Sequence, residues 1–305
     1  MKVLLIGGTG HIGGRLAERL VSRGIAVTVT TRDTSKSVQN SVDHVFVDDV
    51  LKTDWEAICA GFTHVVSLVS PRERDCNTNP ELAKRVVEDG TKRIVEAAQK
   101  INLRFVYLST SQVYGSQLYG QVTESSPASP ENTYAAVHLA AEATVRDVTR
   151  DQACVVRLAN SVGLPLDRNV DTWHLLAHDI AREVIRTGRL TLRSAGLQHR
   201  SFIAMSEVTD ALAHILFAPE VQGIVNISNP VSTSVRSMAE IVNSVYESLS
   251  GAVGVIDAPE PTEKETENPF ELLPTVLAGR GLNLGRQEKI DDEIREIFRA
   301  VKAST

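Results

Sequence analysis

Short apolar runs alternate with segments of helical periodicity through the first half of this sequence. The apolar runs predict strands at Lys2–Gly7, Ile25–Thr31, His44–Val47, His64–Val69, Leu103–Ser109 and Ala153–Leu158. The periodic segments predict helices at about Ile12–Ser22, Trp55–Cys59, Pro80–Lys100 and Thr133–Thr149. Regular alternation of this kind is typical of a parallel sheet with helices on both faces, so we predict a doubly wound α/β fold.

A glycine-rich turn directly follows the first predicted strand. Gly7, Gly10 and Gly13 stand three residues apart, after the buried run and before the first helix. Glycines at these positions remove β-carbons that would block a pyrophosphate, and the helix N-terminus offers unpaired N–H groups to that anion. A purely structural turn is the alternative, but the complete strand–turn–helix–strand context favours dinucleotide binding.

The second half of the chain is less regular. Its patterns predict strands near Arg189–Arg193, Ser201–Ala204 and Gly223–Ser228, and helices at Ser206–Phe217, Val235–Leu249 and Asp291–Val301. We therefore expect a Rossmann-type domain over residues 1–160, to which 206–230 return. Residues 161–205 and 231–305 are expected to form a smaller substrate lobe that closes over it.

Charge and composition exclude several classes of protein. The formal charge of −6 comes from 38 acidic and 32 basic residues without a long run of either sign, which argues against a nucleic-acid surface. No apolar stretch approaches the roughly 20 residues that cross a membrane. The first strand begins at residue 2, which leaves no room for a signal peptide. The 3 cysteines are odd in number and lack metal spacing, so we expect a cytoplasmic protein with reduced thiols.

Three histidines in the second half are candidate metal ligands. His174, His178 and His199, even with Asp171 and Asp179 nearby, lack the spacing of a metal site. We predict no metal.

Several segments together resemble the extended short-chain dehydrogenase/reductase family, which includes nucleotide-sugar epimerases, dehydratases and ketoreductases. The segments that carry the resemblance are Gly7–Gly13, Leu108–Gly115, Tyr134–Glu142, Arg157–Asn160, Arg200–Ile203 and, loosely, Asn226–Asn229. They cover nearly the whole chain in the family's order. The resemblance implies hydride transfer with a nicotinamide cofactor, and a homodimer formed through the helices at 80–100 and 133–149.

The resemblance assigns three catalytic positions. Tyr134 would be the acid/base, and Thr110 the hydroxyl that polarises the same substrate oxygen. The family's lysine, four residues after the tyrosine, is replaced here by His138, which shares the helix face of Tyr134 and is mostly neutral at pH 7. We expect His138 to hold the nicotinamide ribose. Without the cation a phenolate is less stable, which favours ketone reduction; a protein that has lost its chemistry is the alternative.

The cofactor contacts follow from the strand ends. We expect the turn residues Thr9, His11 and Ile12, together with Val69 after the fourth strand, to contact the cofactor. Asp48 or its neighbour Asp49 resembles the position that contacts adenine.

The second strand ends in Thr31 and Arg32, a hydroxyl and a guanidinium that suit a 2′-phosphate. NADP is therefore predicted. Because Asp33 follows at once and can take ribose hydroxyls, NAD is the alternative.

The substrate side is assigned by resemblance as well. Asn160 and Arg200 resemble positions near a nucleotide diphosphate, although Arg200 can equally form a buried ion pair. Ser111 and Gln112 replace the Asp-Glu pair of sugar 4,6-dehydratases, which argues against dehydration. The loop Ser70–Arg74 is expected to line the crevice through Ser70, with its two arginines either there or on the surface.

These assignments lead to one functional prediction. We predict an NAD(P)-dependent oxidoreductase or epimerase that acts by hydride transfer on a carbonyl or carbinol carbon, with a nucleotide-activated sugar as its small-molecule substrate. Two alternatives stay open: a non-catalytic NAD(P)-binding regulator, and a reductase of small non-sugar ketones or aldehydes.

Overall fold

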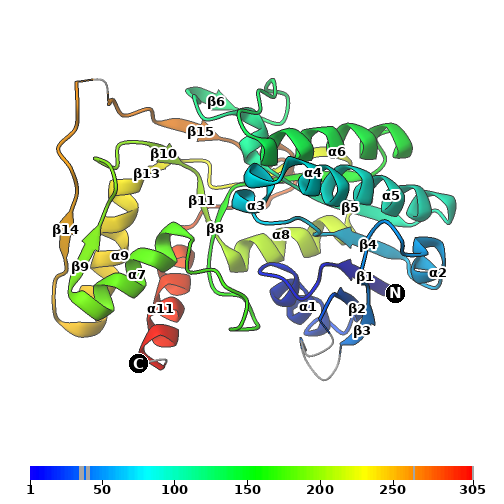
Figure 1. Ribbon diagram of the computed structural model, residues 1–305, viewed down its shortest axis with the longest axis horizontal. Coiled ribbons are helices and arrows are strands. Elements are labelled where there is room, and N and C mark those ends of the chain that lie inside the picture. The colour runs from blue at the N-terminus through cyan, green and yellow to red at the C-terminus, as the bar shows by residue number, and fades with distance from the viewer. Residues whose placement is uncertain (34–37, 39–41, 264, 304–305) are drawn as a thin grey trace.

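The computed structural model describes residues 1–33, 38, 42–263 and 265–303. These residues build a seven-stranded parallel sheet in the order β12-β7-β5-β4-β1-β2-β3 (Figure 1). Its strands are β1 Lys2–Ile6, β2 Ala26–Thr31, β3 Asp43–Phe46, β4 His64–Ser67, β5 Arg104–Thr110, β7 Cys154–Leu158 and β12 Gly223–Ile227. The predicted doubly wound α/β fold is confirmed. The order reverses between β1 and β4, which is where such sheets bind their ligands.

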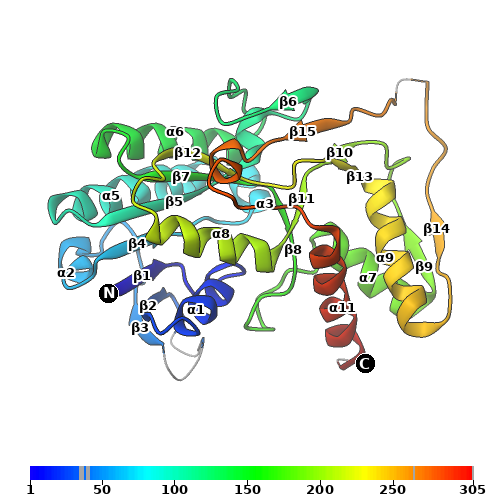
Figure 2. The ribbon, with the colours of Figure 1, turned by 180° about the vertical axis from the view of Figure 1, so that it is seen from behind.

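Helices cover both faces of the sheet (Figures 1 and 2). The helices that accompany the sheet are α1 Gly13–Val21, α2 Trp55–Cys59, α3 Glu73–Thr78, α4 Pro80–Ala83, α5 Gly90–Lys100, α6 Thr133–Thr149 and α8 Met205–Phe217. Alternate residues of β1 enter different cores: Val3 and Leu5 pack with α1 and α8, whereas Leu4 and Ile6 pack with α2, α5 and α6. Burial of both faces explains why the strands are apolar almost throughout.

One predicted helix is interrupted. The structure has α4, then a π-helical stretch at Lys84–Asp89, then α5, where the sequence pattern predicted a continuous helix over 80–100. The apolar period persists through the wider turn, so periodicity alone does not reveal it.

A second packed region joins the carboxyl edge of the sheet. Its helices are α7 Leu176–Thr187, α9 Val235–Ser250 and α11 Gln287–Ala303, which share one apolar core. Short strand pairs accompany them: β8 Asn160–Val162 with β11 Phe202–Ala204, β9 Arg189–Thr191 with β14 Val255–Asp257, β10 His199–Arg200 with β13 Thr233–Ser234, and β6 Gly120–Val122 with β15 Phe270–Leu272. Two segments predicted as strands, near 189–193 and 201–204, belong to these pairs. The pattern analysis missed α7, although Ala177, Ile180, Ala181 and Val184 have helical spacing.

Polar contacts connect the glycine turn to the second region. Arg15 Nη2 lies 2.8 Å from Glu293 Oε1 of α11, and the same carboxylate accepts a hydrogen bond from Ser206 N at 2.8 Å. His11 Nε2 lies 2.7 Å from Gly163 O, and because a carbonyl only accepts, His11 is the donor. Gly163 N donates to His178 Nε2 at 3.4 Å. The start of α1 is therefore fixed to the region that follows β8. Across the described parts of the chain, no helix has the length and hydrophobicity of a membrane span.

A β-carbon at Gly8 has no room. It would lie 2.6 Å from Val29 Cβ and 3.0 Å from Leu5 O. We expect Gly8→Ala to lower the free energy of unfolding by about 1–3 kcal/mol through overpacking, measured by urea denaturation. In a Val29→Gly background, which removes both Cβ and Cγ1 of Val29, the cost of Gly8→Ala should shrink. An equal cost in both backgrounds would show that this contact is not its origin.

Candidate active site

The glycine turn has the geometry of a phosphate cradle. Gly7 has a φ of +80°, which favours glycine, and its N–H donates to Thr30 Oγ1 at 3.0 Å. A β-carbon on Gly13 would lie 2.6 Å from Gly8 Cα, whereas one on Gly10 would meet Gly7 O at 3.3 Å and nothing else within 4 Å. Gly7 and Gly13 are therefore required by the turn itself, and Gly10 leaves the space beside it open. The turn fits the pyrophosphate of a dinucleotide at the N-terminus of α1.

The end of β4 lies beside this turn, as expected at the point where the strand order reverses. Val69 Cγ2 is 3.4 Å from the position of an added β-carbon on Gly7. Ile12, partly buried, packs against the core below the turn. The Nε2 of His11 is already engaged with Gly163 O, so this ring nitrogen is not available to a ligand.

Side chains that follow β2 and β3 differ in how far they are engaged. Thr31 is buried, and its Oγ1 accepts from Asp33 N at 3.1 Å and donates to Asp33 O at 2.9 Å. Thr9 Oγ1 lies 3.4 Å from Thr31 Oγ1. Arg32 and Asp48 are exposed. Residues 34–37 and 39–41, which complete this loop, lie outside the described residues.

The expected catalytic groups meet at the carboxyl edge. Thr110 is the last residue of β5, and its Oγ1 accepts from Gln112 N at 3.2 Å. Tyr134 is the second residue of α6, whose N-cap Asn132 accepts from Ala135 N at 2.8 Å. Burial raises the pKa of Tyr134 well above its usual range, while hydrogen bonds to the hydroxyls of Thr110 and Ser70 act in the opposite direction. Tyr134 is therefore a neutral phenol in contact with both hydroxyls.

His138 has partners within the protein at both ring nitrogens. Its Nδ1 lies 2.7 Å from Tyr107 Oη, and its Nε2 lies 3.1 Å from Ser70 Oγ. Ser70 Oγ donates to Pro71 O at 2.9 Å, so Nε2 carries the proton and Nδ1 accepts from Tyr107. Burial lowers the pKa of His138 to about 3. His138 is thus a neutral link between Ser70 and Tyr107, and it does not replace the charge of a lysine.

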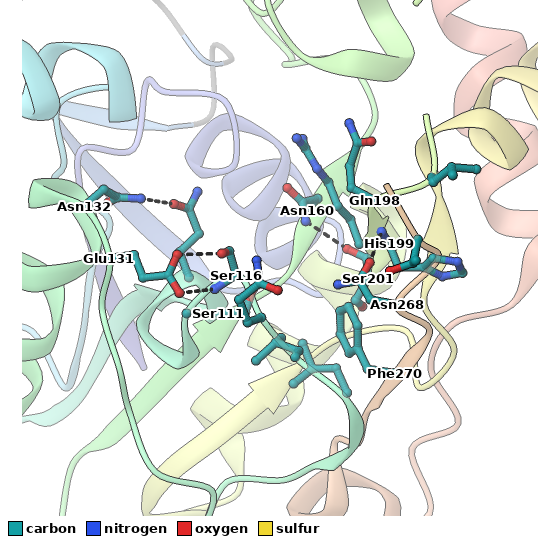
Figure 3. A pocket seen from close by; sticks show the side chains of 18 of the residues that line it. Ser111, Ser116, Glu131, Asn132, Asn160, Gln198, His199, Ser201, Asn268 and Phe270 are labelled. Carbon is teal, nitrogen blue, oxygen red and sulfur yellow. Dashed lines mark hydrogen bonds between the residues drawn. The ribbon is translucent and has the colours of Figure 1, made fainter. Parts of the chain in front are cut away.

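An open cavity of about 610 Å³ is lined by sequence neighbours of these groups, such as Asn132, but not by Thr110 or Tyr134 themselves. Figure 3 shows Glu131, Asn132 and Ser116 on one side of it, and Asn160, Ser201, His199 and Asn268 on the other. Ser111, Gln112 and Arg200 also line the cavity. Arg200 is exposed, so the alternative of a buried ion pair is wrong for this residue. Asn160 Nδ2 donates to Ser201 O at 3.1 Å.

Three acidic residues line the cavity, Glu73, Glu131 and Glu265, and none was singled out from the sequence. Glu73, at the start of α3, lines the cavity, and its Oε2 accepts from Gln112 Nε2 at 2.8 Å. Arg72 instead pairs at the surface with Asp171, at 3.1 Å. The position of this loop after β4 was the available signal, but the pattern does not say which side chain turns inward. In the described parts of the chain, no three His, Cys, Asp or Glu side chains are grouped as metal ligands.

Two buried neutral histidines predict a stability loss in acid. His138 and His178 are 1% and 0% exposed, and burial lowers the pKa of each to about 3. Below the unfolded value of about 6.5 the unfolded chain binds protons that the folded chain refuses, so stability falls as pH falls, by up to about 1.4 kcal/mol per pH unit for each histidine.

Urea unfolding at pH 7.5, 6 and 5 measures this slope. We expect His138→Gln to reduce the slope, whereas His174→Gln, at an exposed position, should leave it unchanged. An identical slope in wild type and His138→Gln would contradict the assignment of His138 as neutral.

Comparisons with known proteins agree with this geometry. A model of the NAD dependent epimerase/dehydratase family matches residues 3–228, a range that contains the seven-stranded sheet except for Lys2. The UDP-glucuronic acid decarboxylase 2 of Arabidopsis thaliana is 25% identical over 305 residues, 93% of this chain and 67% of that protein. The dTDP-6-deoxy-L-talose 4-dehydrogenase (NAD(P)(+)) of Kitasatospora kifunensis is 27% identical over 310 residues, 98% of this chain and 95% of that protein.

Solved structures show the same fold. MoeE5 in complex with UDP-glucose and NAD has a TM-score of 0.82 at 20% identity, over 99% of this chain and 100% of that one. A UDP-N-acetylglucosamine 4-epimerase from Methanobrevibacter ruminantium M1, in complex with UDP-N-acetylmuramic acid, has a TM-score of 0.84 at 18% identity, over 100% of this chain and 99% of that one.

Proposed function

The chain belongs to the NAD dependent epimerase/dehydratase family and is an enzyme of the extended short-chain dehydrogenase/reductase type, and we propose that it transfers a hydride to or from C–O carbons of a nucleotide-activated sugar. The observation that carries this proposal is the meeting of Tyr134 with the Thr110 and Ser70 hydroxyls. This group lies at the sheet edge where the glycine cradle opens. MoeE5, with the same fold, binds UDP-glucose and NAD.

Within this proposal the protein's own groups handle the proton. Tyr134 holds it on the phenol oxygen, and its raised pKa keeps the phenol protonated at neutral pH, in the form that can donate to a ketone oxygen. Thr110 Oγ1 already accepts from Gln112 N, so its own proton can be directed to the substrate oxygen. Ser70 connects Tyr134 to His138, which supports the phenol as a neutral group. Contact of His138 with a ribose hydroxyl requires Nε2 to exchange its bond to Ser70.

The cofactor supplies the hydride donor or acceptor when bound. Gly7, Gly10 and Gly13 would admit its pyrophosphate, with the backbone of Thr9 and His11 and the side chains of Ile12 and Val69 alongside. Asp48 would contact the adenosine. NADP is proposed because Arg32 is exposed at the end of β2, where a guanidinium suits a 2′-phosphate.

Titration calorimetry with each dinucleotide tests the cofactor assignment. We expect NADP to bind more tightly than NAD, and Arg32→Ala to weaken NADP alone, by about tenfold or more. Tighter binding of NAD than of NADP would overturn it.

On the substrate side, Arg200 and Asn160 would hold the diphosphate, and Ser70, Ser111 and Gln112 would face the sugar. Arg200 is exposed in the cavity wall and carries the fork geometry that binds phosphate. NMR of UDP- and dTDP-hexoses incubated with protein and cofactor tests the activity. Binding of these sugars without turnover would favour the regulatory alternative, and Arg200→Ala with unchanged substrate affinity would favour a small-ketone reductase.

We also propose that the enzyme is a cytoplasmic homodimer. Cys59, Cys76 and Cys154 are free and buried, as in a reducing compartment. Leu82 of α4 and Ile101 after α5 are 40% and 44% exposed, on the helices by which the resemblance implies pairing. Light scattering of the purified protein distinguishes dimer from monomer.

A further inference from the structure

The Glu73 carboxylate is fixed at the reacting end of the cavity by a chain of amides. Asn132 Oδ1 accepts from Ala135 N, so its Nδ2 is the atom that donates to Gln112 Oε1, at 3.0 Å. Gln112 Nε2 must then face the other way, toward Glu73 Oε2 at 2.8 Å. Each amide orientation follows from the previous one. Glu73 is therefore the acceptor at the end of the chain.

This carboxylate lies near the catalytic phenol. The charge of Glu73 contributes to the raised pKa of Tyr134, and Gln112, which holds Glu73, follows Thr110 by two residues. Glu131, on the same side of the cavity (Figure 3), accepts from both N and Oγ of Ser116, and these bonds hold its pKa below the usual range. Glu73 is connected through Gln112 to Asn132, so two exposed carboxylates lie on this side of the cavity.

Positive charge is found at the other end. Among the described residues that line the cavity, Arg200 is the only arginine or lysine. It precedes Ser201, whose carbonyl binds Asn160. Arg72 and Arg74, beside Glu73 in sequence, do not line the cavity, and Arg72 is paired with Asp171. Glu265 also lines the cavity, so the charges are separated only in part: Arg200 is available to a diphosphate, and Glu73 and Glu131 lie on the opposite side.

We infer that Glu73 is a specificity-determining residue that admits neutral or amino sugars and excludes glycuronic acids. Glu73 is exposed, and a sugar carboxylate beside it would place like charges together. Hydroxyl or ammonium groups would instead donate to Glu73 Oε1 and Oε2. The inference rests on the proposed function, and it separates this chain from relatives such as UDP-glucuronic acid decarboxylase 2.

Calorimetry with the cofactor-loaded protein tests the inference, using UDP, dTDP, UDP-glucose and UDP-glucuronic acid as ligands. We expect UDP-glucose to bind at least about tenfold more tightly than UDP-glucuronic acid. Glu73→Gln should reduce this ratio at least about fivefold by strengthening UDP-glucuronic acid binding, with UDP affinity unchanged. Glu265→Gln is the matched control, because Glu265 lines the same cavity but binds Thr262; it should leave the ratio unchanged.

The possible failures are distinguishable. Equal affinities for the two UDP-sugars in the wild type, or a ratio unchanged by Glu73→Gln, would overturn the inference and leave the proposed function intact. If Glu265→Gln changed the ratio of the two UDP-sugar affinities as much as Glu73→Gln, the inference would also be overturned, since the net charge of the cavity rather than Glu73 would then determine the specificity. Failure of UDP, dTDP and both sugars to bind would remove the proposed function, and the inference with it.

Discussion

Replacement of Tyr134 by phenylalanine is expected to lower kcat by roughly 100- to 10,000-fold, the usual contribution of a positioned acid/base. The phenol oxygen is the only part of the side chain that is lost, so the packing of the ring against His138, with centroids 4.6 Å apart, is preserved. Cofactor affinity should therefore stay within about twofold of wild type. Steady-state kinetics on a converted nucleotide sugar and a parallel cofactor titration measure the two quantities.

Tyr119→Phe provides the matched control for Tyr134→Phe. Tyr119 is 84% exposed, and its replacement removes the same hydroxyl without touching the site. It should leave kcat unchanged. If Tyr134→Phe has equally little effect, Tyr134 is not the proton donor, and the regulatory alternative gains support.

Truncation of Glu142 to alanine is expected to produce the largest loss of stability. Arg157 and Glu142 are buried, with side chains 4% and 2% exposed, and Arg157 Nη2 lies 2.7 Å from Glu142 Oε2. Ser109 Oγ also donates to Glu142 Oε1, at 2.5 Å. Removal of the carboxylate leaves a buried guanidinium without its counter-charge, which costs about 3–5 kcal/mol. Urea denaturation measures the free energy of unfolding.

Glu296→Ala is the control for this ion pair. Glu296 pairs with Arg299 at the surface of α11, where such pairs contribute at most about 1 kcal/mol. A loss below about 1 kcal/mol for Glu142→Ala would contradict the view that Glu142 neutralises Arg157. Glu142 and Arg157 lie in segments that carry the family resemblance, yet nothing in the sequence indicated that α6 and β7 bring these two side chains together.

Elements with a continuous apolar pattern were predicted well. The bounds of α2 and α6 agree with the prediction, and the sheet strands of the first half shift by at most two residues at their ends. The short pairs around β8–β11 and β9–β14 were not predicted as pairs, because strands of three residues depend on partners distant in sequence rather than on their own periodicity. The π-helical stretch Lys84–Asp89 before α5 was also not predicted, because the apolar pattern was interpreted as one continuous helix.

The site was predicted unevenly for a related physical reason. The positions of Thr110 and Tyr134 follow from strand end and helix start, so the sequence placed them at one edge. The environment of His138 could not be predicted from the sequence pattern. Its partners Ser70, after β4, and Tyr107, in β5, are distant from it in the sequence. Its neutrality at pH 7 was expected from the ordinary histidine pKa, but burial is what lowers that pKa to about 3.

By itself, the sequence determined the doubly wound sheet, the glycine turn between the first strand and helix, and the residue types at the sheet edge, because these depend on local periodicity and on residue type. The tertiary structure alone decided which charges meet: Glu142 with Arg157 in the core, and Glu73 with Gln112 at the reacting end of the cavity. Such pairs join residues 15 and 39 positions apart. These pairs depend on side-chain direction and on burial, which the periodicity of a single strand or helix does not predict.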